Sequence, residues 1–426
     1  MNMEYRALGE LCTITSSKRI FADQYVENGI PFYRSREIIE RNNNSDVSEP
    51  LFISYEVYAS IRERFGVPQK GDMLLTSVGT IGVPYIVKDE RFYFKDGNLT
   101  WMKDFSAELS SRYLYYWISS SFGKDSLVCR CIGSSQAALT IDILKKYKLL
   151  VPERKIQDRI VSILSAYDNL IEVNNKRIKV LEQMAENLYK EWFVRFRFPG
   201  YETAEFEESK LGIIPSSFHV IKMRDAFEYN IGGGWGNDEE DKEYSIPAFV
   251  IRGTDFPRVS KGDLSSCPLR FHKPSNYSSR KLKEDDIILE VSGGTAEQPV
   301  GRTLLVTKDT IERLGGNVIC ASFCKQIRVK QSVISPVYFY YWMQFLYDTR
   351  IIDRFQLQST GIINFQFEYF LRKGEILLPP KEIMDSFESI IRPIHNEIAM
   401  VAKANANLIQ QRDLLLPRLM SGKLEV

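Results

Sequence analysis

The sequence predicts a mixed α+β fold in which two homologous globular α/β domains are separated by two long helices that pair as an antiparallel coiled coil. Three observations predict it: an internal repeat of roughly 210 residues, short strand-like runs in each copy, and a long helical pattern after each copy. At 426 residues the chain also exceeds the roughly 100 to 200 residues of one ordinary domain.

Composition excludes several classes of protein. Hydrophobic residues make up 44% and charged residues 26%, as in globular proteins rather than disordered or fibrous chains. No apolar run approaches the ~18 residues of a membrane span, and Glu4, Arg6 and Glu10 occupy the place of an apolar signal peptide. We therefore expect a cytoplasmic protein. The six cysteines and three histidines lack the spacing of a disulfide framework or zinc site, so we expect no metal.

The repeat is carried by segments that match in the same order in both copies. The first match aligns Arg34 with Arg252 and Glu37 with Asp255. The others are 71–75 with 285–289, 97–99 with 316–318, 113–117 with 338–342, and 150–152 with 377–379. Chance similarity would not preserve this order, so we expect both copies to fold alike.

Within each copy, β-branched and aromatic strand runs alternate with Gly, Asn and Ser turns. Asp72 and Asp286 open paired strands, and their duplicated positions indicate a strand-entry turn rather than nuclease ligands. The aromatic runs 113–117 and 338–342 have helical spacing, which favours a core helix face over base stacking. We place the two domains at residues 1–151 and 213–379.

A long helix follows each domain, at residues 152–198 and 380–426, and each begins near a proline. Apolar residues recur in alternating steps of four and three, which is typical of a coiled-coil seam. The predicted seam residues are Ile156, Ile160, Ile163, Leu181, Leu188, Ile383, Phe387, Ile390, Leu408 and Leu415. Asn174 and Arg177 interrupt this seam. Either they fix its register, or the seam turns toward the surface there.

Two further features of the helical region carry predictions. Residues 199–212 contain four glutamates and are expected to form an acidic, solvated linker. The helix faces outside the seam, including Ile171, Ile178 and Phe193, are predicted to dock partner proteins, the alternative being that they pack onto the chain's own globular domains.

No catalytic motif is recognisable in the chain. It lacks a Walker A loop, HExxH, GxSxG and the Asp/Asn-Pro-Pro-aromatic motif of amino-methyltransferases. The Gly232–Gly234 loop is followed by acidic residues 238–241 that would repel a phosphate, so we expect a mobile loop that presents Trp235 and Asn237. We predict a non-catalytic protein. The alternatives are a self-contained DNA methyltransferase or nuclease with an unrecognised site, and a coiled-coil protein scaffold.

With its duplicated motifs, such as those at Arg34 and Arg252, and its two proline-initiated helices, the whole chain resembles the specificity subunit of type I restriction-modification systems. The resemblance implies that each domain reads one half of a split double-stranded DNA target. It also implies that the helices dock two modification (methyltransferase) subunits, with restriction subunits in the same assembly. No cofactor is then expected on this chain, because S-adenosylmethionine, ATP and Mg²⁺ belong to the partner subunits.

Base readout needs side chains with paired donors or acceptors. Candidates at matched positions are Arg34, Ser35, Arg36, Ser77, Thr80 and Asn98 in the first domain, and Arg252, Thr254, Ser292, Thr295 and Asn317 in the second. Domains that read different half-sites should differ most at the bases, so we expect the matched residues to contact the fold or phosphates. The unmatched candidates are Lys18, Arg19, Ser134, Ser135, Gln136, Trp235, Asn237, Gln356, Gln358, Ser359 and Thr360.

The charge balance limits how the chain can hold DNA. Lys and Arg number 56 against 55 Asp and Glu, a net charge of +1. Phosphate contacts therefore require positive charge sorted onto one face, or positive charge supplied by partner subunits. The second arrangement would make the isolated chain a weak DNA binder.

Overall fold

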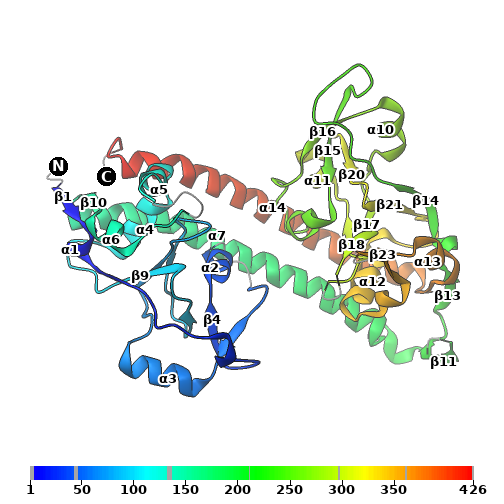
Figure 1. Cartoon of the computed structure of the whole chain (residues 1–426). Helices are drawn as coiled ribbons and strands as arrows, with labels where there is room; N and C mark the ends of the chain where they lie inside the picture. Colours follow the sequence, from blue (N-terminus) through cyan, green and yellow to red (C-terminus); the bar gives the residue numbers. More distant parts are fainter. Residues whose placement is uncertain are drawn as a thin grey trace. The chain divides into compact units, whose positions relative to one another are not determined.

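The structure is a computed structural model that describes residues 4–42, 47–131, 137–210, 212–295, 298–359 and 362–424. The chain divides into two compact units (Figure 1). Unit 1 comprises Met1–Glu172 and Asn407–Val426, and unit 2 comprises Val173–Ala406. Each unit therefore holds one globular part and a stretch of both long helices. The predicted fold class, a mixed α/β protein with long helices, is confirmed.

Unit 1 is built mostly from short strands and helices that precede the first long helix. Its strands are β1 (Glu4–Ala7), β2 (Thr13–Thr15), β3 (Tyr25–Val26), β4 (Ile30–Tyr33), β5 (Leu51–Ile53), β6 (Met73–Thr76), β7 (Pro84–Ile86), β8 (Tyr93–Phe94), β9 (Leu99–Lys103) and β10 (Lys148–Val151). Its helices are α1 (Leu8–Leu11), η1 (Ala22–Gln24), α2 (Ser35–Asn42), α3 (Tyr55–Arg64), α4 (Ser111–Ser119), α5 (Ser121–Val128), α6 (Ile141–Lys146) and the start of α7 (Arg154–Tyr189).

Unit 2 follows along the chain with more strands. These are β11 (Phe206–Ser209), β12 (Gly212–Pro215), β13 (His219–Lys222), β14 (Phe227–Gly232), β15 (Ile246–Ile251), β16 (Leu269–His272), β17 (Ile287–Glu290), β18 (Ser292–Gly294), β19 (Thr303–Leu305), β20 (Val318–Cys320), β21 (Cys324–Val329), β22 (Gln356–Ser359), β23 (Ile362–Phe365) and β24 (Glu375–Leu378). Its helices are η2 (Lys190–Val194), η3 (Tyr201–Thr203), α8 (Met223–Ala226), η4 (Gly253–Asp255), α9 (Phe256–Val259), α10 (Pro274–Arg280), α11 (Lys308–Arg313), α12 (Pro336–Asp348), η5 (Ile351–Phe355), α13 (Phe367–Lys373) and most of α14 (Lys381–Met420).

The two units share one topology. Each has a four-stranded central sheet, with order β2-β9-β6-β7 in unit 1 and β14-β21-β17-β19 in unit 2. Each also has a smaller sheet in which one strand pairs antiparallel with the next and parallel with a later one: β4 with β5 and β8, and β15 with β16 and β20. A strand near the start of each unit pairs with the last strand of that unit, as β1 with β10 and β13 with β24. The repeat in the sequence is therefore a repeat of fold.

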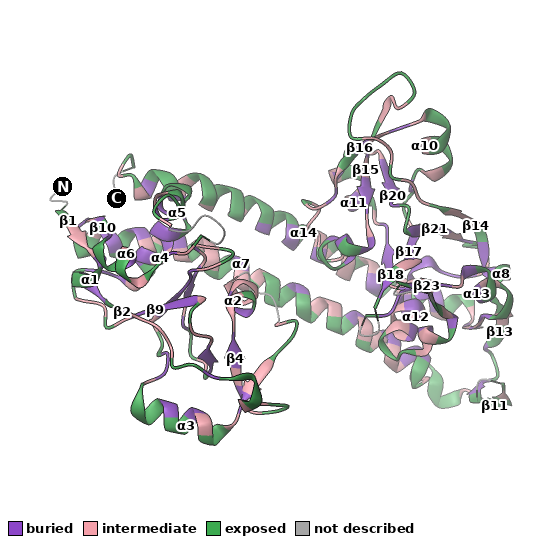
Figure 2. Cartoon of the chain, viewed as in Figure 1, coloured by how far each residue is buried: buried purple, intermediate pink, exposed green. Residues whose placement is uncertain are grey.

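The two aromatic runs form core helices, as predicted. In α4, Tyr113 and Trp117 are buried beneath the central sheet of unit 1, and in α12, Tyr338 and Phe339 are buried in unit 2. A serine begins each helix: the Ser110 and Ser335 hydroxyls accept the backbone N–H of the third residue beyond them. Large aromatic side chains from these helices supply much of each core. Figure 2 colours the buried residues of the chain purple.

The segment predicted as an acidic linker, residues 199–212, is structured, so that prediction was wrong. It contains η3 and β11, and β11 pairs with β12 as a hairpin. Ile214 of this hairpin is buried, and Phe196 packs against both Phe206 and Phe218. The glutamates remain exposed, but the buried Ile214 and the contact between Phe206 and Phe196 are enough to anchor a two-stranded ribbon.

The long helices pair antiparallel within both units. In unit 1, Ile160 and Leu164 of α7 share a core with Leu416 and Leu419 near the end of α14. In unit 2, Ile178 of α7 packs against residues of α14 that include Ile398 and Val401. Buried residues recur every seven positions along α7 and into η2, at Gln157, Leu164, Ile171, Ile178, Ala185 and Trp192. In α14 they lie at Met384, Ile391, Ile398, Asn405 and Leu419, in steps of seven or fourteen.

The predicted seam residues fall into two rows along each helix, and in one row the residue that is buried is the one next to the residue that was predicted. Ile390 is 42% exposed, while the adjacent Ile391 is fully buried. Ile156, Ile163 and Ile383 pack against the globular cores of their own units. The displacement arises because each helix carries apolar residues on two faces, one toward the partner helix and one toward its own globular part. The spacing of apolar residues alone does not separate these faces.

The residues of the other predicted row are buried or half-buried, as predicted for a seam. Ile160 and Phe387 are buried, and Leu181, Leu188, Leu408 and Leu415 are half-buried. Ile171, Ile178 and Phe193, predicted as exposed docking residues, are buried instead, so that prediction was wrong. The first two belong to the buried seven-residue column, and Phe193 packs against Phe387 and Tyr338.

A polar layer interrupts the seam inside unit 2. Asn174 donates its Nδ2–H to Asn405 Oδ1 at 2.8 Å, and Asn405 donates to Asn175 Oδ1 at 2.9 Å. Asn405 is only 7% exposed. This arrangement fits a register-fixing role for Asn174, because a shifted pairing would leave a buried amide without partners. Arg177 instead lies at the surface, in an ion pair with Glu397 at 2.5 Å.

Candidate nucleic-acid interface

In both units, the smaller sheet and the helix after its outer strand form a lobe beside the central sheet, here called the distal lobe. It contains β3, β4, β5 and α3 in unit 1, and β15, β16 and α10 in unit 2. Figure 1 shows α3 and α10 at the ends of these lobes, away from the long helices. Loops at such ends are free to meet a large ligand.

The matched arginines are committed to the fold. Arg34 donates from Nε and Nη2 to the fully buried Glu37 carboxylate, which also accepts the backbone N–H of Arg34 at 2.6 Å. Arg252 makes the same contacts with buried Asp255, each at 2.9 Å. Each pair closes the first turn of a helix. Although burial opposes it, the hydrogen bonds from Arg252 lower the pKa of Asp255.

Other matched polar residues also serve the fold. The buried Ser77 hydroxyl lies 2.6 Å from that of Thr100. The Asn98 carbonyl accepts the Ser77 backbone N–H at 2.8 Å. Asn317 accepts the Tyr277 hydroxyl at 2.6 Å and donates to the Pro247 carbonyl at 3.1 Å. These contacts support the expectation that matched positions preserve the fold.

The remaining matched residues lie at or near the surface. Arg36 is exposed and pairs with Glu40 and Glu49. Thr80, Thr254 and Thr295 are also exposed, whereas Ser35 and Ser292 are half-buried. The Thr295 hydroxyl accepts the Gln298 backbone N–H at 3.1 Å. Thr80 and Thr254 are thus the matched candidates most open to a ligand.

Among the unmatched candidates, Lys18 and Arg19 lie on the loop that enters the distal lobe of unit 1. Both are exposed. Lys18 Nζ lies 5.4 Å from the ring centroid of the exposed Phe65, and Arg19 pairs with Asp96 at 2.8 Å. Arg62 and Arg64 of α3 are exposed on the same lobe. This cluster places positive charge where a phosphate backbone could approach.

The loop that carries Trp235 and Asn237 is held on both sides, contrary to the mobile loop that was expected. The backbone N–H groups of Gly233 and Gly234 donate to the carbonyls of Cys324 and Cys320, both at 2.9 Å. Asn237 exchanges two backbone hydrogen bonds with Phe271 of β16. Trp235 projects from this fixed loop and is 40% exposed.

The last group of candidates lies at the hairpin β22–β23 of unit 2. Gln356 is half-buried and donates to the Asp353 carboxylate at 3.0 Å and the Val300 carbonyl at 3.3 Å, whereas Gln358 is exposed. Ser134, Ser135, Gln136, Thr360 and the side chain of Ser359 lie outside the described residues. Gln358 is therefore the candidate of this group that faces solvent.

Phe21 is a further exposed residue of this region that was not among the residues predicted from the sequence. This residue is 62% exposed on the loop between β2 and β3, two residues after Arg19. An aromatic residue close to Lys18 and Arg19 in the loop 16–24 was the available signal. It was overlooked because the loops of the two copies do not align by sequence.

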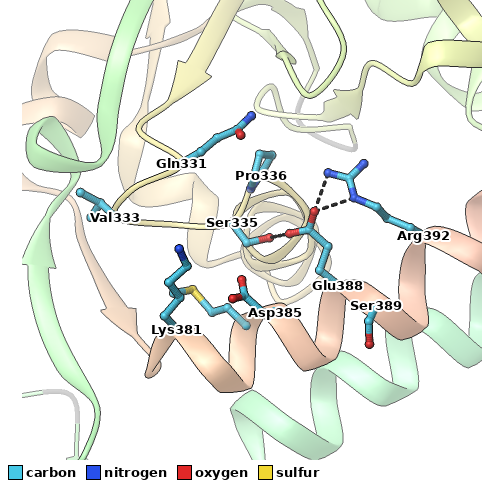
Figure 3. A pocket seen from close by; sticks show the side chains of 10 residues that line it. Gln331, Val333, Ser335, Pro336, Lys381, Asp385, Glu388, Ser389 and Arg392 are labelled. Carbon is cyan, nitrogen blue, oxygen red and sulfur yellow. Dashed lines mark hydrogen bonds and ion pairs between the residues drawn. The ribbon is translucent and has the colours of Figure 1, made fainter.

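A hollow of about 420 Å³ lies beside the first turns of α14 in unit 2 (Figure 3). The Glu388 carboxylate on its wall accepts from the Ser335 hydroxyl and from Arg392, both at 2.5 Å. Arg392 also pairs with Asp285 at 2.9 Å. Glu388 and Arg392 on this wall are therefore engaged with each other and with neighbouring side chains.

Two other kinds of site are absent from the residues that the structure describes. No group of three His, Cys, Asp or Glu side chains in this part of the chain is arranged to hold a metal ion. Of the helices described, none combines the length and apolar composition that crossing a membrane requires.

Comparisons with known proteins agree on one family. Residues 1–183 match the family model for the type I restriction modification DNA specificity domain. The MjaIX specificity subunit of a type I restriction enzyme from Methanocaldococcus jannaschii is 24% identical over 84% of this chain and 78% of its own length. The protein S.HindORF215P of Haemophilus influenzae, named as a specificity subunit, is 29% identical, over 43% of this chain and 45% of its own length.

A solved structure extends the likeness to the fold of nearly the whole chain. The crystal structure of a type I restriction-modification S subunit from M. genitalium superimposes with a TM-score of 0.55. The match covers 98% of this chain and 96% of that one, at 13% sequence identity. The two chains therefore share their architecture.

Proposed function

Because this chain belongs to the family of type I restriction-modification specificity subunits, we propose that it is the non-catalytic subunit that reads a bipartite DNA target. Each globular part reads one half-site through its distal lobe. The observation that carries this proposal is the duplicated topology, which presents two equivalent lobes from one chain. Two readers in one chain suit a target made of two separated blocks.

The pattern of likeness and difference between the lobes supports two distinct half-sites. The buried pairs Arg34–Glu37 and Arg252–Asp255 are alike in both copies. The exposed entry loops differ, since unit 1 offers Lys18 and Arg19 where unit 2 offers Trp235. Shared interiors with different exposed side chains are expected when one fold has been adapted to two base sequences.

The distribution of charge supports a complex in which this chain and its partner subunits both contact the DNA phosphates. Unit 1 groups positive side chains on its distal lobe, whereas the loop at residues 238–241 of unit 2 is acidic. Non-specific affinity grows with the number of phosphates that a protein neutralises. We infer that partner subunits supply much of the phosphate contact and that the isolated chain binds DNA weakly.

We further propose that the exposed apolar face of α7 docks the modification subunits. Val173, Val180 and Met184 are 61%, 54% and 53% exposed. Their spacing of seven and four residues places them on one helix face, opposite the buried column at Ile178 and Ala185. Exposed apolar stripes of this kind are typical of helix-to-helix association. S-adenosylmethionine, ATP and Mg²⁺ are then brought by the partner subunits.

The test of DNA recognition is to co-express the chain with a modification subunit from the same genome and to map adenine methylation across the host genome. We expect a motif of two short defined blocks around an unspecified gap, which disappears when this chain is omitted. Methylation without the chain would contradict the proposal. A stable complex without methylation would favour the scaffold alternative.

Docking is tested by Val180→Lys together with Met184→Lys, which place two charges on the exposed stripe. We expect the modification subunit to be lost from the purified complex, because the charges cannot be buried without partners. Gln183→Lys is the matched control, since it adds a lysine at an exposed position adjacent in sequence but outside the stripe. Equal loss in the control and the double variant would contradict this docking face.

A further inference from the structure

We propose that each unit places one exposed aromatic ring against a base of its half-site: Phe21 in unit 1 and Trp235 in unit 2. The inference rests on the proposed DNA-reading function and adds the residues that make the contact. It is drawn from three observations: the place of both residues in the topology, their exposure, and the way their loops are held.

The two residues occupy the same place in the fold. In unit 1 the chain leaves the central sheet after β2, passes Phe21, and pairs through β3 with β5. In unit 2 it leaves the central sheet after β14, passes Trp235, and pairs at Asn237 with Phe271 of β16. Because β5 and β16 are equivalent strands of the smaller sheets, both rings project from the entry to a distal lobe.

Trp235 is held in a fixed orientation. The Arg270 guanidinium lies 4.6 Å from the indole centroid and donates from Nε to the Trp235 carbonyl at 3.2 Å. Arg270 is itself 8% exposed and forms an ion pair with Asp238. A ring stacked on a nearly buried arginine loses little conformational freedom when it meets a ligand.

The backbone beside Trp235 permits only glycine. Gly236 has φ of +69°, and a Cβ built there would lie 2.3 Å from the Phe271 carbonyl oxygen. Gly233 is equally confined, since a Cβ would lie 2.2 Å from the Ala321 carbonyl oxygen. The run of glycines in the sequence thus lets the loop press against the sheet while the indole projects outward.

Phe21 projects from a similarly closed turn. Its backbone N–H donates to the Gln24 side chain at 3.0 Å, and its carbonyl accepts the Gln24 backbone N–H at the same distance. The ring is 62% exposed. Like Trp235 in unit 2, Phe21 is the exposed aromatic residue of the loop that enters the distal lobe, so its ring is open to a ligand that reaches this loop.

The charges around Trp235 favour a base over a phosphate. Asp238 pairs with Arg270, and Asp241 accepts the backbone N–H groups of residues 243 and 244. Glu239 and Glu240 are exposed and would repel a phosphate. An apolar ring can instead contact a thymine methyl group in the major groove or wedge against a base step.

The test uses the full complex with the modification subunit and maps methylated motifs for Trp235→Ala and Phe21→Ala. We expect each substitution to relax one position in one block, and the two substitutions to affect different blocks. The matched controls are Phe206→Ala on β11 and Phe122→Ala on α5, which remove exposed rings, 47% and 66% accessible, away from the entry loops. The control motifs should equal that of the unsubstituted complex.

A second measurement separates a base contact from a structural effect. The affinity of each complex for its target duplex is measured from low to high salt. Trp235→Ala should weaken binding about tenfold without changing the salt slope, since a base contact releases no phosphate counterions. Trp235→Phe should recover part of the loss, because the smaller ring retains an apolar face.

The possible results separate a failure of the aromatic contact from a failure of the proposed function. Unchanged motifs in both alanine variants, or equal changes in the controls, overturn the aromatic contact while leaving the proposed function in place. A reduced salt slope in Trp235→Ala would also contradict it, since that result indicates a phosphate contact. If the unsubstituted complex shows no split motif, the proposed function itself fails, and the inference fails with it.

Discussion

The two units place an aspartate at the same point of the same sheet but surround it with different partners. Asp72, before β6, accepts the Gln69 backbone N–H at 2.9 Å and the Trp101 indole N–H at 2.8 Å. Asp286, before β17, accepts the equivalent backbone N–H from Lys283 at 2.6 Å. The duplication has thus preserved the strand-entry turn that the matched aspartates predicted.

The side-chain partners of these aspartates have diverged. Gln326 stands in the strand ladder where unit 1 has Trp101, and it donates to Asp286 at 2.7 Å. Arg328 adds two contacts to Asp286, each at 2.8 Å. The half-buried Asp72 carboxylate is therefore paired with a neutral indole, and the buried Asp286 carboxylate with a guanidinium. The hydrogen bond that each aspartate accepts from a backbone N–H is the same in both units, whereas the side chains that contact the aspartate differ.

The largest expected effect comes from removing the charge of Asp286. Asp286→Asn leaves the Arg328 guanidinium, 22% exposed, without its anion. We expect unit 2 to lose about 3 kcal/mol of stability, because breaking a buried ion pair leaves an uncompensated charge. Hydrogen exchange of the β17 and β21 amides measures this loss. Asp72→Asn is the control in unit 1, and equal losses in both units would contradict the distinction.

The next effect tests whether the matched arginines serve the fold. Arg252→Ala and Arg34→Ala each leave a buried carboxylate with fewer donors, so we expect about 2 kcal/mol of destabilisation in the unit concerned. The methylated motif should be unchanged in both variants. A new motif with normal thermal stability would show instead that these arginines read bases.

A smaller effect is expected at the polar layer of the helix pair. By the repeat, α14 has Asn405 where α7 has Ile178. Asn405→Ala removes two hydrogen bonds and should cost about 1 kcal/mol. Asn405→Leu should restore stability while weakening the preference for one register. Cysteine crosslinking at neighbouring helix positions measures the register, and a single crosslinked register in Asn405→Leu would argue against this role.

The smallest effect concerns pH. Burial raises the pKa of Asp72 above its usual value of 3.8, although hydrogen bonds from Gln69 and Trp101 oppose the shift. A carboxyl whose folded pKa is raised stabilises the fold below its unfolded pKa, and this contribution is lost as pH rises through the folded pKa. Unit 1 should therefore lose some stability as the pH rises above about 4. Asp72→Asn should flatten that change in urea unfolding. An unaltered pH profile in this variant would contradict the assignment.

Much of the fold could be predicted from the sequence, because it depends on patterns that repeat. The aromatic helices, the two domains and the antiparallel helix pair follow from apolar spacing and from the matched segments. Apolar spacing alone could not show that Ile391 rather than Ile390 is the buried residue, since α14 carries apolar residues on two faces. The β11–β12 hairpin was hidden by its glutamates, which suggested a solvated linker.

The candidate interface was less predictable than the fold. Residues that match between copies, such as Arg34 and Asn317, proved to hold the structure together. Phe21 and Trp235 occupy the same place in the topology, yet the number of residues that separates each of them from the preceding strand differs. Only the three-dimensional arrangement relates them, because loops of different length do not align by sequence.

The most direct test of the central claim is an exchange of one globular part. Residues 216–379, from after the β11–β12 hairpin to the start of α14, are replaced by the equivalent segment of a relative with a known target. Methylation is then mapped with the same modification subunit. We predict that one block of the motif changes while the other block and the gap stay the same. A change in both blocks, or in neither, would contradict the assignment of one half-site to each unit.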